Sequence, residues 1–167
     1  MFLELAIMFV FPALMAFAGA TDLFTMTIPN RVSIGLVAGF VCLALFTGLG
    51  WEAIALHFGV GLAMLVICIG MFAMGWIGGG DAKLFAATSL WMGQEYIFEY
   101  ALNAAVLGGV LTLAILALRM FPLPAGLAAQ AWLARLHNAG EGVPYGIALA
   151  AAGLMVYPKI NWIQGLT

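Results

Sequence analysis

Charged side chains are scarce in this chain. Only 7% of its 167 residues are Asp, Glu, Lys or Arg, while 66% are hydrophobic, and the formal net charge is −2. A soluble domain carries about 25% charged residues, so this composition is typical of a protein embedded in a membrane. The few Lys and Arg residues form no cluster that could bind nucleic acid. We therefore expect a lipid bilayer as a partner, and no nucleic acid.

Cysteine is also scarce, which limits the possible cofactor chemistry. The two cysteines, Cys42 and Cys68, both lie inside apolar runs and form no CxxC pair. Zinc and redox sites therefore have no support from the sequence, and both residues are expected to be buried small hydrophobes. We expect neither a metal nor a cofactor.

Long apolar runs separated by short polar or Gly/Pro breaks predict an all-α, polytopic membrane protein with about six transmembrane helices. Helices are expected because each unpaired backbone group in lipid costs several kcal/mol. The runs also lack the alternating polarity of a β-barrel. The N-terminal run has no basic n-region and is expected to be a retained first span. Residues 1–167 are treated as one domain. The six predicted helices cover residues 2–20, 32–49, 53–77, 82–98 (interrupted at 93–95), 100–118 and 144–162.

The basic residues predict how these helices are oriented. Cytoplasmic loops of membrane proteins carry an excess of Lys and Arg. Four of the five basic residues lie in the first, third and fifth connections, and Lys159 is the exception. Both termini are therefore expected to face away from the cytoplasm. The four residues are Arg31, Lys83, Arg119 and Arg135.

Two aspartates, Asp22 and Asp81, each end a long apolar run and are expected on the cytoplasmic face. A carboxylate at membrane depth costs on the order of 2.5–3.5 kcal/mol, so such a residue points to function. Two neighbouring carboxylates tend to share a proton. One can then accept a proton from water while the other donates one to a scissile carbonyl oxygen, which is aspartyl peptide hydrolysis. The structural alternatives are a helix cap for Asp81 and an ordinary interfacial position for Asp22.

The residues before Asp81 read Gly78-Gly79-Gly80-Asp81, which is a Gly-x-Gly-Asp string. Glycines allow unusual backbone conformations and the close approach of a substrate strand. With this string, Asp22 followed by Ile28-Pro29-Asn30, and the segment from Val143 to Ala148, the chain resembles the type IV prepilin peptidases. These are GxGD-type membrane aspartyl peptidases, and the match is best to their short form associated with Flp (Tad) pilus assembly.

The resemblance implies a function and a set of site residues. Such enzymes cut the basic leader from prepilins and pseudopilins at the cytoplasmic face of the bacterial inner membrane. Archaeal preflagellin peptidases share the chemistry, so that substrate class stays open. Longer family members also methylate the new N-terminus and carry paired CxxC motifs, which are missing here, so methyltransferase activity is not expected. The catalytic residues implied are Asp22 and Asp81, and the implied active-site loop or substrate-binding residues are Gly78, Gly80, Lys83, Asn30, Pro144, Tyr145 and Gly146.

Several positions have two readings. Lys83 is either a cytoplasmic anchor or a charge that tunes the aspartates, and Asn30 either caps a helix or contacts substrate. His57 is expected to be a hydrogen-bonded packing residue. Residues 123–138 are expected to form an amphipathic helix on the membrane interface, or alternatively a lid beside the aspartates.

Two other functions remain open at this level. A small proton-coupled transporter or channel could use the same aspartates. Their predicted place at helix ends, away from the bilayer midplane, argues against it. A non-enzymatic assembly subunit would need neither carboxylate.

Overall fold

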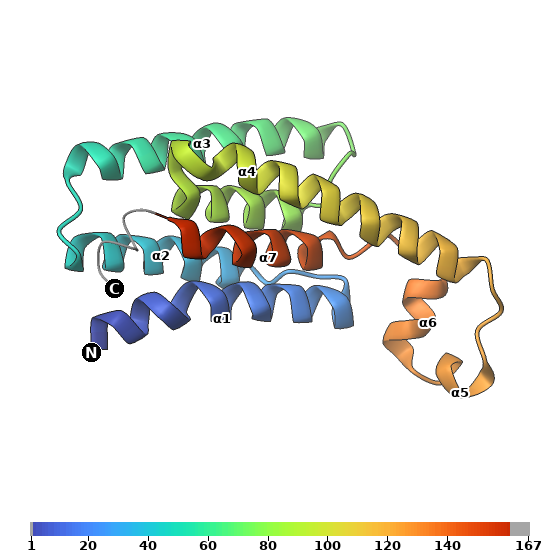
Figure 1. The fold of residues 1–167 in the computed structure, drawn as a ribbon. Coiled ribbons are helices and arrows are strands. Elements are labelled where there is room, and N and C mark those ends of the chain that lie inside the picture. Colours follow the sequence, from blue (N-terminus) through green and yellow to red (C-terminus); the bar gives the residue numbers. More distant parts are fainter. Residues whose placement is uncertain (1, 161–167) are drawn as a thin grey trace.

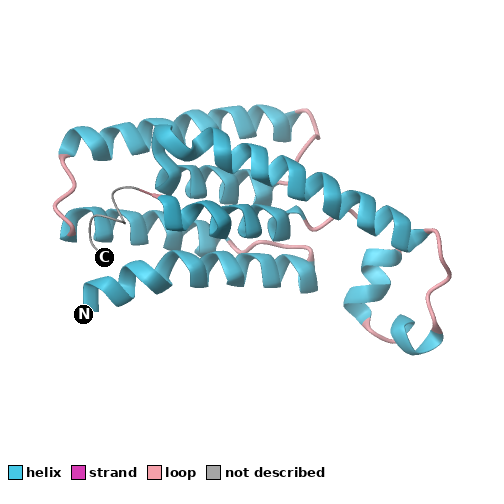
Figure 2. Cartoon of the chain, in the orientation of Figure 1, coloured by secondary structure: helices cyan, strands magenta, loops and turns pink. Residues whose placement is uncertain are grey.

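The structure, a computed structural model, describes residues 2–160 and is built of helices, with no strand among these residues (Figure 2). The all-α class predicted from composition is therefore confirmed for this part of the chain. The helices are α1 (Phe2–Thr25), α2 (Asn30–Phe46), α3 (Trp51–Ala73), α4 (Gly79–Arg119), α5 (Ala125–Ala128), α6 (Ala131–His137) and α7 (Tyr145–Val156), followed by the 3-10 turn η1 (Tyr157–Lys159).

Helix α4 reverses direction at Gly93. Its Phe85 and Tyr100 rings stack with centroids 5.0 Å apart, although fifteen residues of straight helix would separate them by about 22 Å. Gly93 has φ 60° and ψ −168°, a conformation that favours glycine. The two halves correspond to the fourth and fifth predicted segments, and the second half begins directly after Gly93 rather than near residue 100. The interruption predicted at residues 93–95 is therefore a hairpin.

His57 of α3 supports this reversal. Its Nδ1 lies 2.7 Å from the carbonyl oxygen of Leu90, three residues before Gly93. That carbonyl belongs to the last turn of a helix that cannot continue, so it needs a partner from outside. A Cβ atom on Gly93 would lie only 2.7 Å from His57 Cε1. The expectation that His57 is a hydrogen-bonded packing residue is confirmed.

Each long helix runs antiparallel to the one before it in the chain, when the two halves of α4 are counted separately (Figure 1). The C-terminal end of α1 and the N-terminal ends of α2, α4 and α7 consequently meet at one end of the molecule, here called the site end. Helices α3 and α4 are long and apolar enough to cross a membrane, and the segment Phe9–Thr25 and α2 are shorter apolar helices. The six spans and their orientation stay predictions, and residues 161–162 of the predicted last span lie outside the described residues.

Helix α1 extends beyond its predicted end at residue 20, so Asp22 lies within the helix and not after it. Two threonine hydroxyls show how the polar residues fit there. Thr21 Oγ1 donates to the Phe17 carbonyl at 2.9 Å, and Thr25 Oγ1 donates to the Thr21 carbonyl at 2.6 Å. Both hydroxyl groups thus find their hydrogen-bond partners within the helix, so the polar stretch is accommodated in it.

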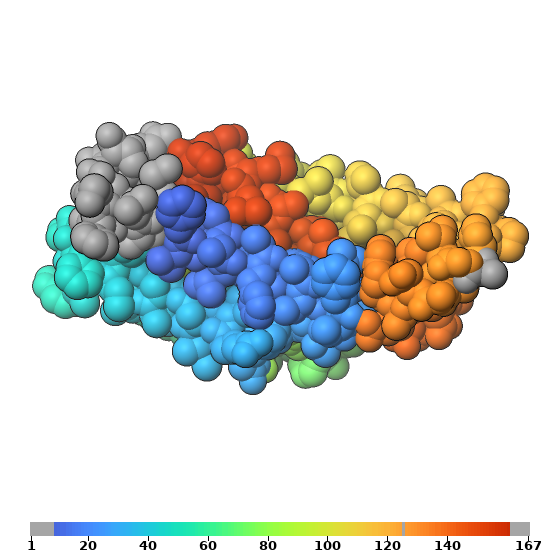
Figure 3. Space-filling model, turned by 90° about the horizontal axis from the view of Figure 1, so that it is seen from below, coloured from blue at the N-terminus to red at the C-terminus, as the bar shows by residue number. Residues whose placement is uncertain are grey.

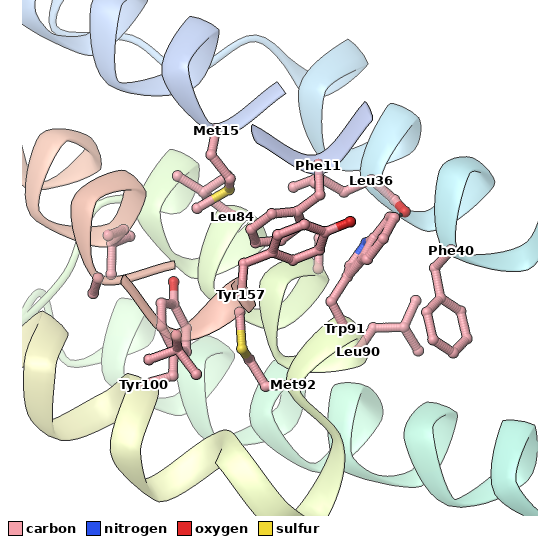
Figure 4. Close-up of a cluster of buried hydrophobic side chains, with 14 of the residues drawn as sticks. Phe11, Met15, Leu36, Phe40, Leu84, Leu90, Trp91, Met92, Tyr100 and Tyr157 are labelled. Carbon is pink, nitrogen blue, oxygen red and sulfur yellow. Dashed lines mark hydrogen bonds between the residues drawn. The ribbon is translucent and has the colours of Figure 1, made fainter. Parts of the chain in front are cut away.

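The core joins α1, α2, α4, α7 and η1, and aromatic rings pack among aliphatic side chains within it (Figure 4). Trp91 is fully buried, and its Nε1 donates to the Leu36 carbonyl at 2.9 Å. The Phe11 ring stacks on Tyr157 at 4.4 Å and lies 5.1 Å from Trp91. This packing fixes α1 against α4, the two helices that carry the aspartates. Of the two cysteines, Cys68 is buried as expected, whereas Cys42 is exposed, which corrects that expectation.

Candidate active site

Asp22 lies in the last two turns of α1 and is almost completely buried, with 5% of its surface exposed. Its Oδ2 accepts a hydrogen bond from the backbone N–H of Gly146 at 2.7 Å. Gly146 belongs to the first turn of α7, after the N-cap residue Pro144. Backbone N–H groups in a first turn have no partner within their helix and bind anions well. The start of α7 therefore holds the Asp22 carboxylate.

This contact requires glycine at position 146. A Cβ atom there would lie 2.7 Å from Asp22 Oδ2, 2.8 Å from Ile28 Cδ1 and 2.9 Å from Asp22 Cβ. Real Cβ atoms do not approach neighbours so closely, so any side chain would displace the carboxylate. The pattern Pro144-Tyr145-Gly146 thus has a local physical reason.

Asp81 is the third residue of α4, and Gly78 is the N-cap. The Asp81 carboxylate lies beside Gly78, where a Cβ built on the glycine would be 2.9 Å from Asp81 Oδ2. The charge of an acidic side chain at this position is favoured at a helix N-terminus. Asp81 therefore helps to start α4, although it is not the N-cap residue. It remains half-buried.

The fold brings the two aspartates to the same end of the molecule. Asp22 lies at the C-terminal end of α1 and Asp81 at the N-terminal end of α4, and both of these ends belong to the site end. Ile28 lies between Gly80 and Gly146, two glycines next to the aspartates. A Cβ on Gly80 would be 3.3 Å from Ile28 Cβ, and Ile28 Cδ1 also packs against Gly146. Ile28 is part of the Ile28-Pro29-Asn30 motif, but the sequence did not predict it as a site residue.

Lys83 and Asn30, both candidates from the sequence, contact each other. Lys83 Nζ donates to Asn30 Oδ1 at 3.0 Å, and both residues are exposed at the site end. The N-cap of α2 is Pro29, and no side chain caps this helix, so the capping role expected for Asn30 is wrong. Asn30 instead links the start of α2 to the first turns of α4.

Tyr145 points away from the carboxylates. Its hydroxyl lies 3.0 Å from Thr112 Oγ1, and its ring packs against Gly108 in the second half of α4. The role supported for Tyr145 is therefore to fix the start of α7 against α4. Of the three residues 144–146, Gly146 is the one that touches an aspartate.

Helix α6 covers the end of α1 close to Asp22. The Arg135 guanidinium donates to the Phe24 carbonyl, and the rings of Trp132 and Phe24 meet edge to face at 5.9 Å. Arg119 Nε also donates to the Leu136 carbonyl at 2.8 Å. Figure 3 shows this orange segment against the end of α1. The single amphipathic helix expected over 123–138 is thus two short helices, held beside the site end. Arg135 was missed as a site neighbour because its partner is a distant backbone carbonyl.

The chemistry available here comes from two carboxylates and the helix starts at which they lie. Within the described residues, no three His, Cys, Asp or Glu side chains lie close enough together to hold a metal ion. Two neighbouring carboxylates can share one proton, so that one serves as a base and the other as an acid. Acid–base activation of water is the chemistry that this arrangement supports.

Comparison with known proteins agrees with this chemistry. The model of the type IV leader peptidase family matches residues 9–113, which is more than half of the chain. The matched region contains both aspartates and the glycines before Asp81, whereas residues 144–146 lie beyond it. No curated protein and no solved structure matches.

Proposed function

The chain belongs to the type IV leader peptidase family, and on this premise we propose that it is an aspartyl endopeptidase that cuts the leader from Flp-type prepilins and pseudopilins. Asp22 and Asp81 are the proposed catalytic residues. The observation that carries the proposal is that two carboxylates far apart in the sequence lie at the same end of the fold: Asp22 accepts a hydrogen bond from the Gly146 amide at the start of α7, and Asp81 lies in the first turn of α4.

In the proposed mechanism the two carboxyl groups share one proton. The ionised carboxylate accepts a proton from a water molecule while the water oxygen attacks the scissile carbonyl carbon. The other carboxyl group donates its proton to the carbonyl oxygen, giving a neutral tetrahedral diol. Collapse of the diol breaks the C–N bond: one diol hydroxyl returns its proton to the carboxylate that had donated one, and the amine nitrogen receives the proton taken from water. The products are a leader ending in a carboxyl group and a mature N-terminal amine.

The Gly146 amide positions the Asp22 carboxylate for these steps, because its hydrogen bond fixes the direction of that side chain. Asp81 lies in the first turn of α4, where the helix N-terminus favours a negative charge. Because the water must lie between the two acids, small displacements of either one lower the rate. Lys83 and Asn30 lie at the same end and are proposed to border the substrate path.

We further propose that the chain crosses the bacterial inner membrane several times, with the site end on the cytoplasmic side. Arg31, Lys83, Arg119 and Arg135 all belong to segments at the site end, in agreement with the positive-inside rule. At the opposite end, Lys159 Nζ lies 2.5 Å from Glu99 Oε1, so the exceptional basic residue is paired with an acid. Methyltransferase activity is not part of the proposal, because the sequence lacks the paired CxxC motifs of the longer enzymes.

The proposal is tested by incubating the protein in lipid vesicles with a prepilin that has a basic leader and an apolar helix. Mass spectrometry of the products gives the position of the cut. We expect cleavage at the leader junction by the unmodified protein and none by Asp22→Asn or Asp81→Asn. Glu52→Gln, an exposed acid in the first turn of α3 at the other end, is the matched control and should cleave normally. Normal cleavage by either Asn variant, or aspartate-dependent ion flux with no cleavage of any prepilin, would contradict the proposal.

A further inference from the structure

An apolar groove of about 510 Å³ opens between α2 and α3. Both helices pack on α4 but make little contact with each other, so the first half of α4 forms the floor of the groove. The exposed rim residues Ile34 and Leu62, on opposite walls, leave 66% and 59% of their surfaces uncovered. In a bilayer the groove is therefore open sideways to the lipid.

The groove runs to the site end of the molecule. There it is bordered by Lys83, which is hydrogen-bonded to Asn30. Along α4 it extends from Lys83 to Leu90, which is about 10 Å at 1.5 Å per residue. A molecule lying in the groove would thus have one end at the site end, in the helix turn next to the one that carries Asp81.

Small residues line part of the groove. Ala86 and Ala87 lie on the α4 floor between Lys83 and Leu90, Gly61 is on the α3 side, and Ala38 lies on the α2 wall. A Cβ on Gly61 would meet Leu90 and the Ala86 carbonyl of α4 at 3.4–3.5 Å. Small residues let the backbone of a second helix approach closely, which is how helices associate in membranes. A lipid chain needs no such floor.

We propose that this groove, called here the α2/α3 groove, binds the apolar helix of the membrane substrate and aligns its scissile bond with Asp22 and Asp81. This inference rests on the proposed function and adds a substrate-docking site to it. The apolar walls match an apolar helix that remains in the bilayer, and the end of the groove at Lys83 places the end of that helix at the site end of the molecule. Recognition through the groove depends on the apolar helix and not on the leader.

A blocking variant tests the groove. Val37 lines it on α2, and Val37→Trp should fill it; Leu113→Trp, on the exposed second half of α4, is the matched control. Each variant is given a full-length prepilin and a short peptide that spans the cut but lacks the apolar helix. Val37→Trp should lower kcat/KM for the full-length substrate at least tenfold and leave the short peptide unaffected. Equal effects on both substrates, or no effect on either, would overturn the inference.

Photocrosslinking tests docking separately from catalysis. In the Asp81→Asn variant, a benzophenone amino acid at position 62 should crosslink to the substrate helix, and the same group at position 113 should not. Crosslinks from position 62 to lipid alone would overturn the inference even where cleavage is normal. Because this experiment needs no turnover, substrate crosslinks without cleavage by the unmodified protein would refute the proposed peptidase activity while supporting the docking site.

Discussion

Replacing Gly146 with alanine should show how much catalysis depends on the exact position of the Asp22 carboxylate, because it displaces that group without changing Asp22 itself. The new Cβ would lie 2.7 Å from Asp22 Oδ2 and 2.8 Å from Ile28 Cδ1. Ordinary contacts between heavy atoms are about 3.5 Å, so the carboxylate has to retreat by roughly 0.8 Å. It then loses the 2.7 Å hydrogen bond from the Gly146 amide, and a bond of this type to a charged group contributes about 1.5–3 kcal/mol. A misplacement of about 1 Å at a catalytic group lowers rates by about 100-fold. We expect Gly146→Ala to lower kcat by about 30- to 100-fold.

Two other glycines provide the controls for this experiment. Gly109 has no atom within 4 Å of a built Cβ, so Gly109→Ala should have normal activity. Gly153 is in the same helix as Gly146, and its Cβ would meet the flexible Met15 Cε at 2.8 Å, so Gly153→Ala should lower stability without lowering kcat. The assay is single-turnover cleavage of a prepilin in vesicles, combined with thermal unfolding of each variant. Activity of Gly146→Ala within threefold of the unmodified protein would refute the role assigned to the Gly146 amide.

Three further predictions concern the surroundings of the site. Trp91→Ala should lower the free energy of unfolding by about 3–5 kcal/mol, because it removes a fully buried ring. Unfolding in denaturant measures this loss, and a loss below 1 kcal/mol would contradict the core described. His57→Ala should cost about 1–3 kcal/mol because the Leu90 carbonyl loses its partner, and a neutral effect in the same assay would contradict the support of the reversal by His57. Arg135→Ala should speed limited proteolysis between α5 and α7 several-fold, because α6 loses its bond to the Phe24 carbonyl; an unchanged cleavage pattern would show that α6 is held by other contacts.

Local chemistry made some features predictable. Apolar runs with few charges gave the helical class, and Gly93-Gln94-Glu95 indicated an interruption, although the connection to the next helix was expected near residue 99 and not at Gly93. Asp22 and Asp81 were recognisable because an acid at the end of an apolar run is costly. The end of α1 was misjudged because hydroxyl groups of Thr21 and Thr25 bond back into the helix, which composition does not reveal.

Other features depend on contacts between distant residues. The hydrogen bond from Gly146 to Asp22 spans 124 positions, and the one from Arg135 to Phe24 spans 111, so no local pattern indicates either. The exposure of Cys42 was missed for another reason. Side chains that face lipid are as apolar as those in the core, so hydrophobicity alone does not distinguish the two positions in a membrane protein.

The central claim is that Asp22 and Asp81 act as one catalytic unit. Single-turnover cleavage of one prepilin by Asp22→Asn, Asp81→Asn and the double variant tests it most directly. Residues that act as a unit are strongly non-additive. We expect each single variant to lose on the order of 1,000-fold or more in rate, and the double variant to be no slower than the slower single variant. Two losses that multiply in the double variant, or substantial activity in either single variant, would contradict the account.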